Sequence, residues 1–368
     1  MKICFIAQFP PPMHGLSKAV ETLYTSELNI EFARKGEYEF EKVDITSNKR
    51  IFSNLFKIIN SNAELFYLTI SQTKWGNLRD LIILSCINLK RKKCVIHLHG
   101  GYYRILVERE LSKIQRKWNY YLVSKLGGTI VLSDSLKENF KGMINEKNIF
   151  TVENCVDNQF VMSKEQYENK IDRINQKNIF KVLWLSNFIE SKGYTKVLEM
   201  ARLEKERVKR GEKQRFHFEF AGKFFDKVDE NNFFEYIKDN DLKEYVTFHG
   251  IVGGEEKKML LRDSDIFILL TTYPKEGQPI SILEAMANGL TIVTTDHAGI
   301  GDIVENNVNG ILLSTDELAN IKKIYTKMLK LTRENYKKYA NTNYQDSLSN
   351  YSEKTYISKM KNVFERVK

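Results

Sequence analysis

The strongest constraint on the fold of this chain is the regular alternation of short apolar runs with segments of helical pattern. The runs are rich in β-branched and aromatic residues, which is typical of strands buried on both faces of a parallel sheet. They span residues 2–9, 65–70, 94–100 and 128–133 in the first half, and 181–188, 216–222, 246–250, 265–272 and 291–296 in the second. At 368 residues the chain also exceeds the usual size of one hydrophobic core. We therefore predict an α/β protein with two doubly wound, Rossmann-like domains that face each other across a deep cleft.

The boundary between these domains is expected in a polar segment between the two sets of strands. Residues 163–178 are charged and lack an apolar period, as an interdomain linker does. We predict an N-terminal domain at 1–165, a C-terminal domain at 166–344, and a last amphipathic helix at 345–368 that packs back on the N-terminal domain.

The first residues favour a buried strand over a targeting signal. The apolar run in "MKICFIAQFPPPMHG" could mimic a signal peptide, but it is short and ends at Pro10, Pro11 and Pro12. No segment reaches the ~20 apolar residues that a membrane span needs. The four cysteines are widely spaced and form no C-x-x-C pair, which predicts reduced thiols in a cytosolic protein.

The positive charge is concentrated in the first half of the chain. Residues 51–150 hold 16 Lys and Arg against 7 Asp and Glu, out of a net charge of +10 for the whole sequence. One face of the N-terminal domain is therefore expected to be cationic. Nucleic-acid binding is disfavoured, because no recognisable module accompanies the charge.

The stretch "KEGQPISILEAMANG" at 275–289 places a carboxylate on each side of an apparent helix start. Pro279 suits a first helical turn and Gly289 a helix stop. The free amides of Ile280 and Ser281 would attract phosphate. Glu276 and Glu284 would then flank a diphosphate and accept hydrogen bonds from paired hydroxyls, as a nucleotide sugar requires. The alternative is a solvated loop residue and a charge on the helix surface.

In this context the chain resembles glycosyltransferase family 4, which comprises retaining enzymes of the GT-B fold. The spacing from Glu276 to Glu284, "AMANG" and "TTDHAGIGDIVENNVNGIL" carry the resemblance, with "LWLSNFIESKGY", "FEFAGK", "VTFHGIV" and "VENCVD" in the family's order. It covers nearly the whole chain. It implies that the N-terminal domain lies on the acceptor side and that the C-terminal domain binds a nucleoside diphosphate sugar.

The resemblance also implies roles for single residues of the C-terminal domain. Glu284 would bind the donor ribose, and Glu276, with Gly277 beside it, would contact the donor sugar. Lys192 would stabilise the departing diphosphate; without this context it could equally be a surface lysine. Family members usually carry an arginine five positions earlier, where this chain has Asn187. Either the helix start and Lys192 suffice, or Lys223 or Arg104 replaces that cation.

Two further candidates come from the N-terminal half. Gly15 follows the first strand, where the absence of a side chain would let the backbone approach the diphosphate. By resemblance, His99 would hydrogen-bond the donor sugar. His97 and His99 share a strand face and could be read as half a metal site, but no third ligand is spaced to join them. We interpret His97 as structural.

The resemblance implies transfer without a metal ion. Asp263 and Asp265 form an Asp-x-Asp pair, but they precede a strand and so fall at the edge of the sheet opposite the ligand crevice. We expect no cofactor besides the nucleoside diphosphate sugar, with a UDP-sugar as the first candidate. A dinucleotide oxidoreductase is disfavoured, because the first loop lacks G-x-G-x-x-G.

The acceptor is indicated only by residues 103–126. A helix here would align Val107, Leu111, Ile114, Trp118 and Tyr121 in one apolar stripe, with a basic remainder. Such a helix could lie on an anionic membrane, or its stripe could pack on the sheet.

We predict a cytoplasmic enzyme, peripheral at the inner face of the membrane. It would transfer a sugar to a lipid-linked or saccharide acceptor in bacterial surface polysaccharide or glycan assembly. A sugar-nucleotide epimerase or hydrolase, and a non-catalytic sugar-nucleotide-binding protein, remain alternatives.

Overall fold

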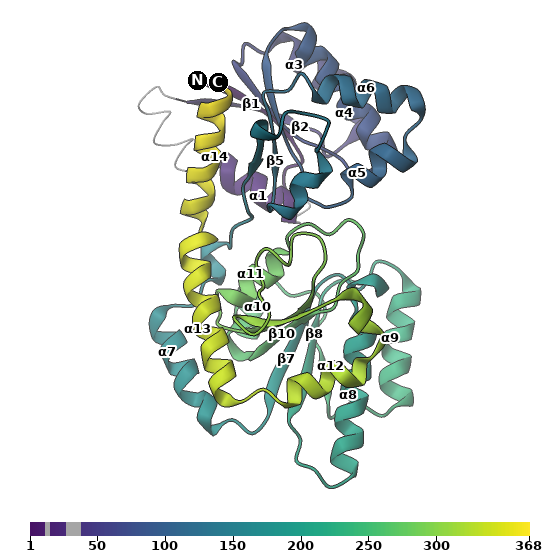
Figure 1. The fold of residues 1–368 in the computed structure, drawn as a ribbon, viewed down its shortest axis with the longest axis vertical. Coiled ribbons are helices and arrows are strands. Elements are labelled where there is room, and N and C mark those ends of the chain that lie inside the picture. The colour runs from purple at the N-terminus through teal and green to yellow at the C-terminus, as the bar shows by residue number, and fades with distance from the viewer. Residues whose placement is uncertain (12–14, 27–37) are drawn as a thin grey trace. The chain divides into compact units, whose positions relative to one another are not determined.

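The computed structural model describes residues 1–11, 15–26 and 38–368; of the residues named above, Pro12 falls outside this range. The chain forms two compact units, each built on a parallel sheet of six strands with helices packed against it (Figure 1). The predicted α/β architecture with two doubly wound sheets is therefore confirmed. Both ends of the chain belong to the first unit.

Unit 1 contains the strands β1 to β6 in the order β2-β1-β3-β4-β5-β6, all paired in parallel. Their bounds are β1 Lys2–Ala7, β2 Glu39–Asp44, β3 Leu65–Thr69, β4 Lys93–His97, β5 Gly128–Val131 and β6 Ile149–Thr151. The sequence did not predict β2 or β6. β2 is a half-exposed edge strand with several charged residues, and β6 has only three residues.

The helices of unit 1 are α1 Gly15–Tyr24, α3 Ile51–Asn60, α4 Lys74–Leu89, α5 Tyr103–Ile105, α6 Lys113–Val123 and α14 Glu353–Val367. One face of the sheet forms a core with α1 and with the C-terminal helix α14. Ile3, Phe5 and Ala7 of β1 point into this core, since side chains alternate along a strand. Tyr356 and Phe364 of α14 are fully buried there.

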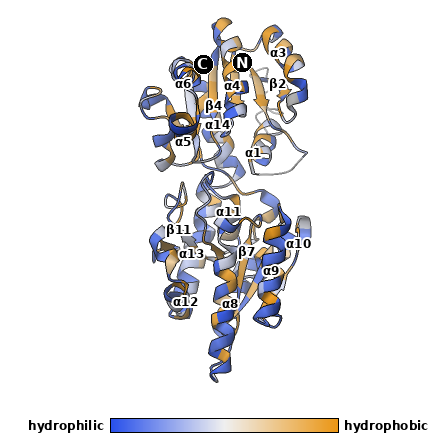
Figure 2. Ribbon diagram, turned by 90° about the vertical axis from the view of Figure 1, so that its right-hand side faces the viewer, coloured by the Kyte–Doolittle hydropathy of each residue, from blue (hydrophilic) through white to orange (hydrophobic). Residues whose placement is uncertain are grey.

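Unit 2 has the strand order β12-β11-β10-β7-β8-β9. The bounds are β7 Phe180–Leu185, β8 Phe216–Ala221, β9 Val246–Phe248, β10 Ile266–Leu269, β11 Thr291–Thr295 and β12 Gly310–Leu313. Val182 and Trp184 of β7 belong to one core, and Leu183 and Leu185 to the core on the opposite face. Because both faces are covered, β7 is apolar without interruption from Val182 to Leu185, and β4 of unit 1 from Cys94 to Ile96 (Figure 2).

The helices of unit 2 are α7 Lys164–Arg173, α8 Tyr194–Lys209, α9 Lys227–Asp239, α10 Gly254–Asp263, α11 Ile280–Met286, α12 Ile321–Leu329 and α13 Arg333–Asn350. The expected linker at 163–178 is wrong, because α7 occupies most of it. Ser163 and Gln166 form a capping box that starts this helix. Tyr167 then stacks on Tyr344 of α13, with ring centres 4.2 Å apart.

The division between the units differs from the predicted boundaries. Unit 1 comprises 1–155, 274–278 and 353–368, and unit 2 comprises 156–273 and 279–352. The boundary at 165 is thus ten residues too late, because Val156 already pairs with Ser352 of unit 2. The C-terminal helix does pack on unit 1, as expected, but it begins at Glu353 and not at residue 345.

The single helix expected at 103–126 is interrupted. A short π-helix spans Leu106–Glu110, and Leu111 is extended before Ser112 caps the new helix α6. Val107 and Leu111 are buried, whereas Ile114 and Tyr121 are exposed. The predicted continuous stripe is therefore wrong. Among the described residues, no helix combines the length and the apolar character that crossing a bilayer requires.

Candidate active site

The strand order of unit 2 places a candidate ligand site after β7 and β10. These neighbouring strands are the point where the chain reverses its direction of progress across the sheet. In open α/β sheets ligands bind at the carboxyl ends of the strands at such a point. The segments that follow β7 and β10 are those that carry Asn187, Lys192 and, in α11, Glu284.

The loop after β7 is fixed against the loop after β10. Gly193 has a φ of +82°, and a Cβ atom there would lie 2.4 Å from the carbonyl oxygen of Leu270. The amide of Thr272 donates to the Ser191 carbonyl over 2.7 Å. Only glycine suits such a left-handed, crowded position. The turn that ends at Lys192 is therefore held at the switch point of the sheet.

Lys192 ends a 3₁₀ turn, Glu190–Lys192, and its side chain is partly exposed. Its Nζ atom lies 5.2 Å from the centre of the Tyr273 ring, within cation–π range. Asn187 is exposed, two residues beyond β7. The sequence prediction thus places both residues correctly at the carboxyl edge of the sheet.

The two bases considered as substitutes for the missing arginine have different surroundings. Lys223 is exposed just beyond β8, and its carbonyl accepts from the amide of Phe188, the neighbour of Asn187. Arg104 belongs to unit 1, where its guanidinium donates to the carbonyls of Glu138 and Lys141. Lys223 is therefore the base that lies on the same sheet edge as Asn187.

The helix after β10 begins as the sequence predicts. Pro279 is its N-cap, and the first internal bond runs from the amide of Ile282 to the Pro279 carbonyl. The amides of Ile280 and Ser281 precede that bond. The helix ends at Met286, and Gly289 adopts a left-handed φ of +63°, which agrees with its predicted role as a stop.

Glu284 is buried in this helix, so the alternative of a surface charge is wrong. Its carboxylate accepts from Nζ of Lys257 on α10 at 2.6 Å. Burial raises the pKa of Glu284, the Lys257 ammonium acts against the rise, and Asp157 adds to it. Sequence reasoning missed Lys257, because nothing in a helix of alternating charges marks one lysine as the partner of a distant glutamate.

Glu276 lies in the short segment 274–278 that belongs to unit 1, although the sequence places it in the C-terminal domain. A Cβ atom on Gly277 would lie 2.9 Å from the carbonyl oxygen of His99. Gln278 accepts from the amide of Asn154 at 2.7 Å through its side chain, and from the Asn154 side chain at 2.9 Å through its carbonyl. These contacts hold the buried Glu276 within unit 1.

The structure brings the segment of Glu276 against the loop that carries His99. Gly277 packs on the backbone of His99, which follows the last residue of β4 by two positions. Glu276, Gly277 and His99 therefore lie on neighbouring segments of unit 1, and their contact with the donor sugar stays a prediction. The sequence did not identify Gln278 as the residue that holds this segment in place, because its partner Asn154 is known only from the structure.

His97 has a structural environment, as interpreted from the sequence. Its ring is fully buried, with the Tyr67 hydroxyl 2.7 Å from Nδ1. Burial holds the pKa of His97 well below its ordinary value, and His99 acts in the same direction. The rings of His97 and His99 are in contact, with centres 3.9 Å apart and planes tilted by 34°. His97 is therefore neutral and supports the partly exposed ring of His99.

The remaining residues considered from the sequence include Gly15 of unit 1 and Asp265 of unit 2. Gly15 is the exposed first residue of α1, beyond β1. Asp265 precedes β10, accepts from Nζ of Lys177 and the amide of Lys181, and is buried, as a turn residue at the amino edge is expected to be. In the described part of the chain no three His, Cys, Asp or Glu side chains form a group that could hold a metal ion.

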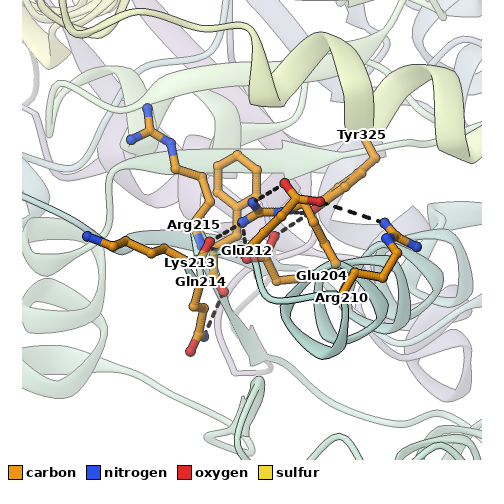
Figure 3. Close-up of polar contacts among 9 residues, drawn as sticks. Glu204, Arg210, Glu212, Lys213, Gln214, Arg215 and Tyr325 are labelled. Atoms are coloured by element: carbon orange, nitrogen blue, oxygen red, sulfur yellow. Dashed lines mark hydrogen bonds and ion pairs between the residues drawn. The ribbon is translucent and has the colours of Figure 1, made fainter.

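A pocket of about 380 Å³ lies at the opposite, amino edge of the unit 2 sheet, in front of β7 and β8. Figure 3 shows the polar contacts beside this pocket, with Glu204, Glu212 and Tyr325 labelled. Arg207 donates to the carboxylates of Glu204 and Glu212 and to the Tyr325 hydroxyl. Each nitrogen of the Arg207 guanidinium is thus already bonded to a protein group. These contacts join α8 to α12 at the edge of the sheet opposite the switch point, so we interpret the cluster as structural.

Comparison with known proteins identifies relatives among glycosyltransferases. Residues 164–346 match the family described as glycosyl transferases group 1. An 80-residue stretch is 42% identical to the amylovoran biosynthesis glycosyltransferase AmsK of Erwinia amylovora, covering 21% of this chain and 20% of that protein. The poly(ribitol-phosphate) alpha-N-acetylglucosaminyltransferase of Staphylococcus aureus is 24% identical over 270 residues, 73% of this chain and 50% of that protein. The matched regions thus span a fifth and a half of these relatives.

Solved structures support the fold over the whole chain. The Anabaena protein Alr3699/HepE in complex with UDP superimposes with a TM-score of 0.72 and 16% identity, over 99% of this chain and 100% of that one. The same protein has been solved in complex with UDP-glucose. At this identity the similarity establishes the fold, which is the GT-B architecture of two doubly wound sheets that the sequence predicts.

Proposed function

We propose that this protein, whose residues 164–346 match the glycosyl transferases group 1 family, is a retaining hexosyltransferase of the family 4 type. It transfers a sugar from a nucleoside diphosphate sugar to a lipid-linked or saccharide acceptor in the assembly of a bacterial surface polysaccharide or glycan. The observation that carries the proposal is the arrangement at the switch point of unit 2, where the Lys192 turn is fixed against the loop after β10 and Glu284 is buried in the next helix.

The residues of unit 2 suit the nucleotide end of the donor. An ionised Glu284 accepts hydrogen bonds from the two ribose hydroxyls, and Lys257 holds its carboxylate in place. Lys192 supplies positive charge to the diphosphate, together with the amides of Ile280 and Ser281, while Asn187 and Lys223 lie on the same sheet edge. The complexes of HepE with UDP and UDP-glucose support a UDP-sugar as the donor to test first.

The residues of unit 1 suit the sugar end. Glu276 and His99 contact the transferred sugar, and Gly277 keeps the Glu276 segment against the His99 backbone. Gly15 has no side chain, so its backbone can approach the diphosphate. A carboxylate beside the reacting carbon stabilises positive charge that develops as the bond breaks. The same interaction is weaker in the ground state, so it contributes to turnover more than to donor affinity.

The proposed reaction proceeds on one face of the sugar. The bond between the anomeric carbon and the diphosphate oxygen breaks, and the acceptor hydroxyl forms a new bond to that carbon from the same side. The departing phosphate oxygen takes the proton of the hydroxyl, so no covalent glycosyl-enzyme is needed. Lys192 stabilises the charge on the diphosphate, and we propose that this occurs without a metal ion. We place the enzyme in the cytoplasm, peripheral at an anionic membrane surface.

Donor binding is tested by the melting point in the presence of nucleoside diphosphates and their sugars, because a ligand that binds only the native state raises it. We expect one base to be selected. The Glu284→Ala variant should lose this shift, whereas Glu276→Ala should keep it and lose turnover in a sugar-transfer assay. Near wild-type behaviour of both variants would contradict the assignment.

The same assay separates the proposal from its alternatives. Release of free sugar without an acceptor would indicate a hydrolase, and donor binding without any turnover would indicate a binding protein. Turnover should also persist in excess chelator. Loss of turnover in chelator that manganese or magnesium restores would show that the proposed charge stabilisation by Lys192 is incomplete.

A further inference from the structure

Three helices of unit 1 lie side by side on one face of its sheet. α4 packs against both α3 and α6. The indole Nε1 of Trp118 on α6 donates to the Ser85 hydroxyl of α4 at 3.1 Å. At the other side of α4, Nζ of Lys90 donates to the carbonyls of Ile59 and Ser61 at the end of α3. The outer sides of these helices therefore form one continuous surface.

This surface exposes large apolar side chains from each of the three helices. We call it the basic–apolar face and define its apolar members as Phe52, Phe56, Ile59, Trp75, Ile82, Leu89, Ile114 and Tyr121. Phe52 is 84% exposed, Trp75 77%, Leu89 82% and Ile114 81%. These large apolar side chains on α3, α4 and α6 therefore lie on the surface of unit 1 and outside its core.

The apolar members follow helical periods, which aligns them along each helix. Phe52, Phe56 and Ile59 are spaced by four and three residues on α3, and Trp75, Ile82 and Leu89 by seven on α4. Other residues of these helices, such as Ile58 and Leu84, are buried and face the sheet. Figure 2 shows α3 as largely hydrophobic, although it covers the sheet with only part of its surface. These helices are thus apolar on a side that the described structure leaves exposed.

The charge on these helices has one sign. Residues 48–60, 74–93 and 113–125 contain 13 Lys and Arg and a single acid, Asp80. Asp80 is buried and bound to Arg79, so it contributes no negative charge to the surface. Exposed basic residues lie on these helices or in the segments next to them: Lys49, Arg50, Lys57, Arg91, Lys92, Lys93, Lys113, Lys117 and Lys125.

We propose that the basic–apolar face docks on an anionic lipid bilayer, with its apolar side chains inserted at the headgroup boundary and its lysines and arginines against the lipid phosphates. This combination of exposed Trp, Phe and Leu with surrounding basic residues matches an interfacial membrane surface. A protein partner would need acidic side chains throughout a contact that is otherwise apolar, and a second copy of this face would repel the first by its charge. This inference rests on the proposed function, which places the enzyme at an anionic membrane, and it identifies the surface that makes the contact.

The inference changes which residues the contact requires. The sequence pointed to the basic residues of one helix at 103–126, beside an apolar stripe that included Val107 and Leu111. In the structure those two apolar residues are buried, and Arg116 is paired with Glu108 at 3.4 Å. The contact instead extends over α3 and α4.

The test is sedimentation of the full-length protein with vesicles of phosphatidylcholine, with or without 30% phosphatidylglycerol as a probe of roughly physiological anionic content. Most of the wild type should sediment with the anionic vesicles and a much smaller fraction with the neutral ones, because apolar insertion alone binds weakly. Phe52→Ser combined with Phe56→Ser, and separately Trp75→Ser, should each reduce the bound fraction by about fivefold or more. Phe225→Ser in unit 2 is the matched control, because this residue is 62% exposed outside the face, and it should bind as wild type does.

Salt separates the two contributions to docking. Raising the ionic strength to about 0.5 M should weaken binding of wild type without abolishing it, since screening removes attraction to phosphate but leaves apolar insertion. The inference is overturned if wild type ignores anionic vesicles at low salt, if Phe225→Ser loses binding as the face variants do, or if sedimentation velocity shows that the face variants dissociate a dimer. The melting-point shift with nucleotide is measured on the same variants and should be unchanged, so failure of docking and failure of donor binding are distinguishable.

Discussion

Glu284 is a residue whose chemistry depends on one neighbour. Its native pKa is raised above the ordinary value by burial, so it takes up a proton at a pH at which an exposed glutamate is still ionised. The proposed contact with ribose requires the ionised form. Donor affinity should therefore fall as the pH decreases through this raised pKa, which can be followed by calorimetric titration of a nucleoside diphosphate between about pH 5 and 8.

The Lys257→Met variant sharpens this prediction. Lys257 lowers the pKa of Glu284, so its removal should raise that pKa further and shift the loss of affinity to a higher pH. Lys258→Met is the control, because Lys258 lies on the same helix but pairs with the exposed Glu255. Identical pH profiles for wild type and Lys257→Met would mean that Glu284 does not govern donor binding.

Gly193 is a second residue at which backbone geometry decides the outcome. An alanine there would take up a left-handed φ and also collide with the Leu270 carbonyl. Gly211 has a similar φ of +90°, but no atom lies within 4 Å of the added Cβ. Gly211→Ala therefore measures the cost of the left-handed backbone without that of a collision. We expect Gly211→Ala to cost about 1–2 kcal/mol in the free energy of unfolding, and Gly193→Ala about 3 kcal/mol or more. Urea denaturation measures both, and equal losses would show that the loop after β10 relaxes freely.

At the scale of elements, the segment 274–278 after β10 is a part of unit 1 that is inserted between two segments of unit 2. Asn154 anchors it through Gln278. Asn154→Ala removes the side-chain donor to a buried carbonyl and should destabilise the protein by about 1–3 kcal/mol. If the anchor positions Glu276, turnover should fall by about tenfold with donor affinity nearly unchanged.

Asn145→Ala tests whether that effect belongs to the loop. Asn145 is an exposed residue of unit 1 whose side chain also makes one capping hydrogen bond, to the amide of Lys147. The Asn145→Ala variant should lose less stability than Asn154→Ala and keep wild-type turnover. A fall in donor affinity as large as the fall in turnover for Asn154→Ala would show a general loss of structure and not a misplaced Glu276.

The elements also show which parts of the fold can be read from sequence. Strands such as β7 and β10 are buried on both faces, so their composition alone identifies them. β2 cannot be identified by its composition, because several of its side chains are partly exposed and charged. The break at Leu111 and the helix α7 depend on local capping by Ser112 and Ser163, which a search for apolar periods passes over.

The candidate site divides in the same way. Glu276, Glu284 and Lys192 could be proposed because their spacing and their positions after strands are properties of the sequence. Lys257, Asn154 and the assignment of the Glu276 loop to unit 1 could not, since they depend on contacts between residues 27 to 124 positions apart. Such pairs are set by tertiary packing and leave no local pattern.

At the scale of the whole molecule, neither unit is a continuous segment of chain. Unit 1 includes α14, which follows the last residue of unit 2 in the sequence. Five of its side chains are buried in unit 1: Tyr356, Met360, Val363, Phe364 and Val367. At about 1.5–3 kcal/mol for each buried apolar side chain, their burial is comparable to the entire stability of a typical domain, about 5–15 kcal/mol.

A chain shortened to residues 1–352 should therefore lose the fold of unit 1 and keep that of unit 2. Hydrogen exchange followed by peptide mass spectrometry measures the two units separately: amides of β1, β3 and β4 should lose protection, while those of β7 and β10 keep it. Phe364→Ala in the full chain should weaken unit 1 protection by about 3–5 kcal/mol, and Asn362→Ala, exposed on the same helix, should leave it unchanged. Protection that falls equally in both units would mean that they unfold as one cooperative body, and unchanged protection in the shortened chain would mean that α14 covers a core that is already complete.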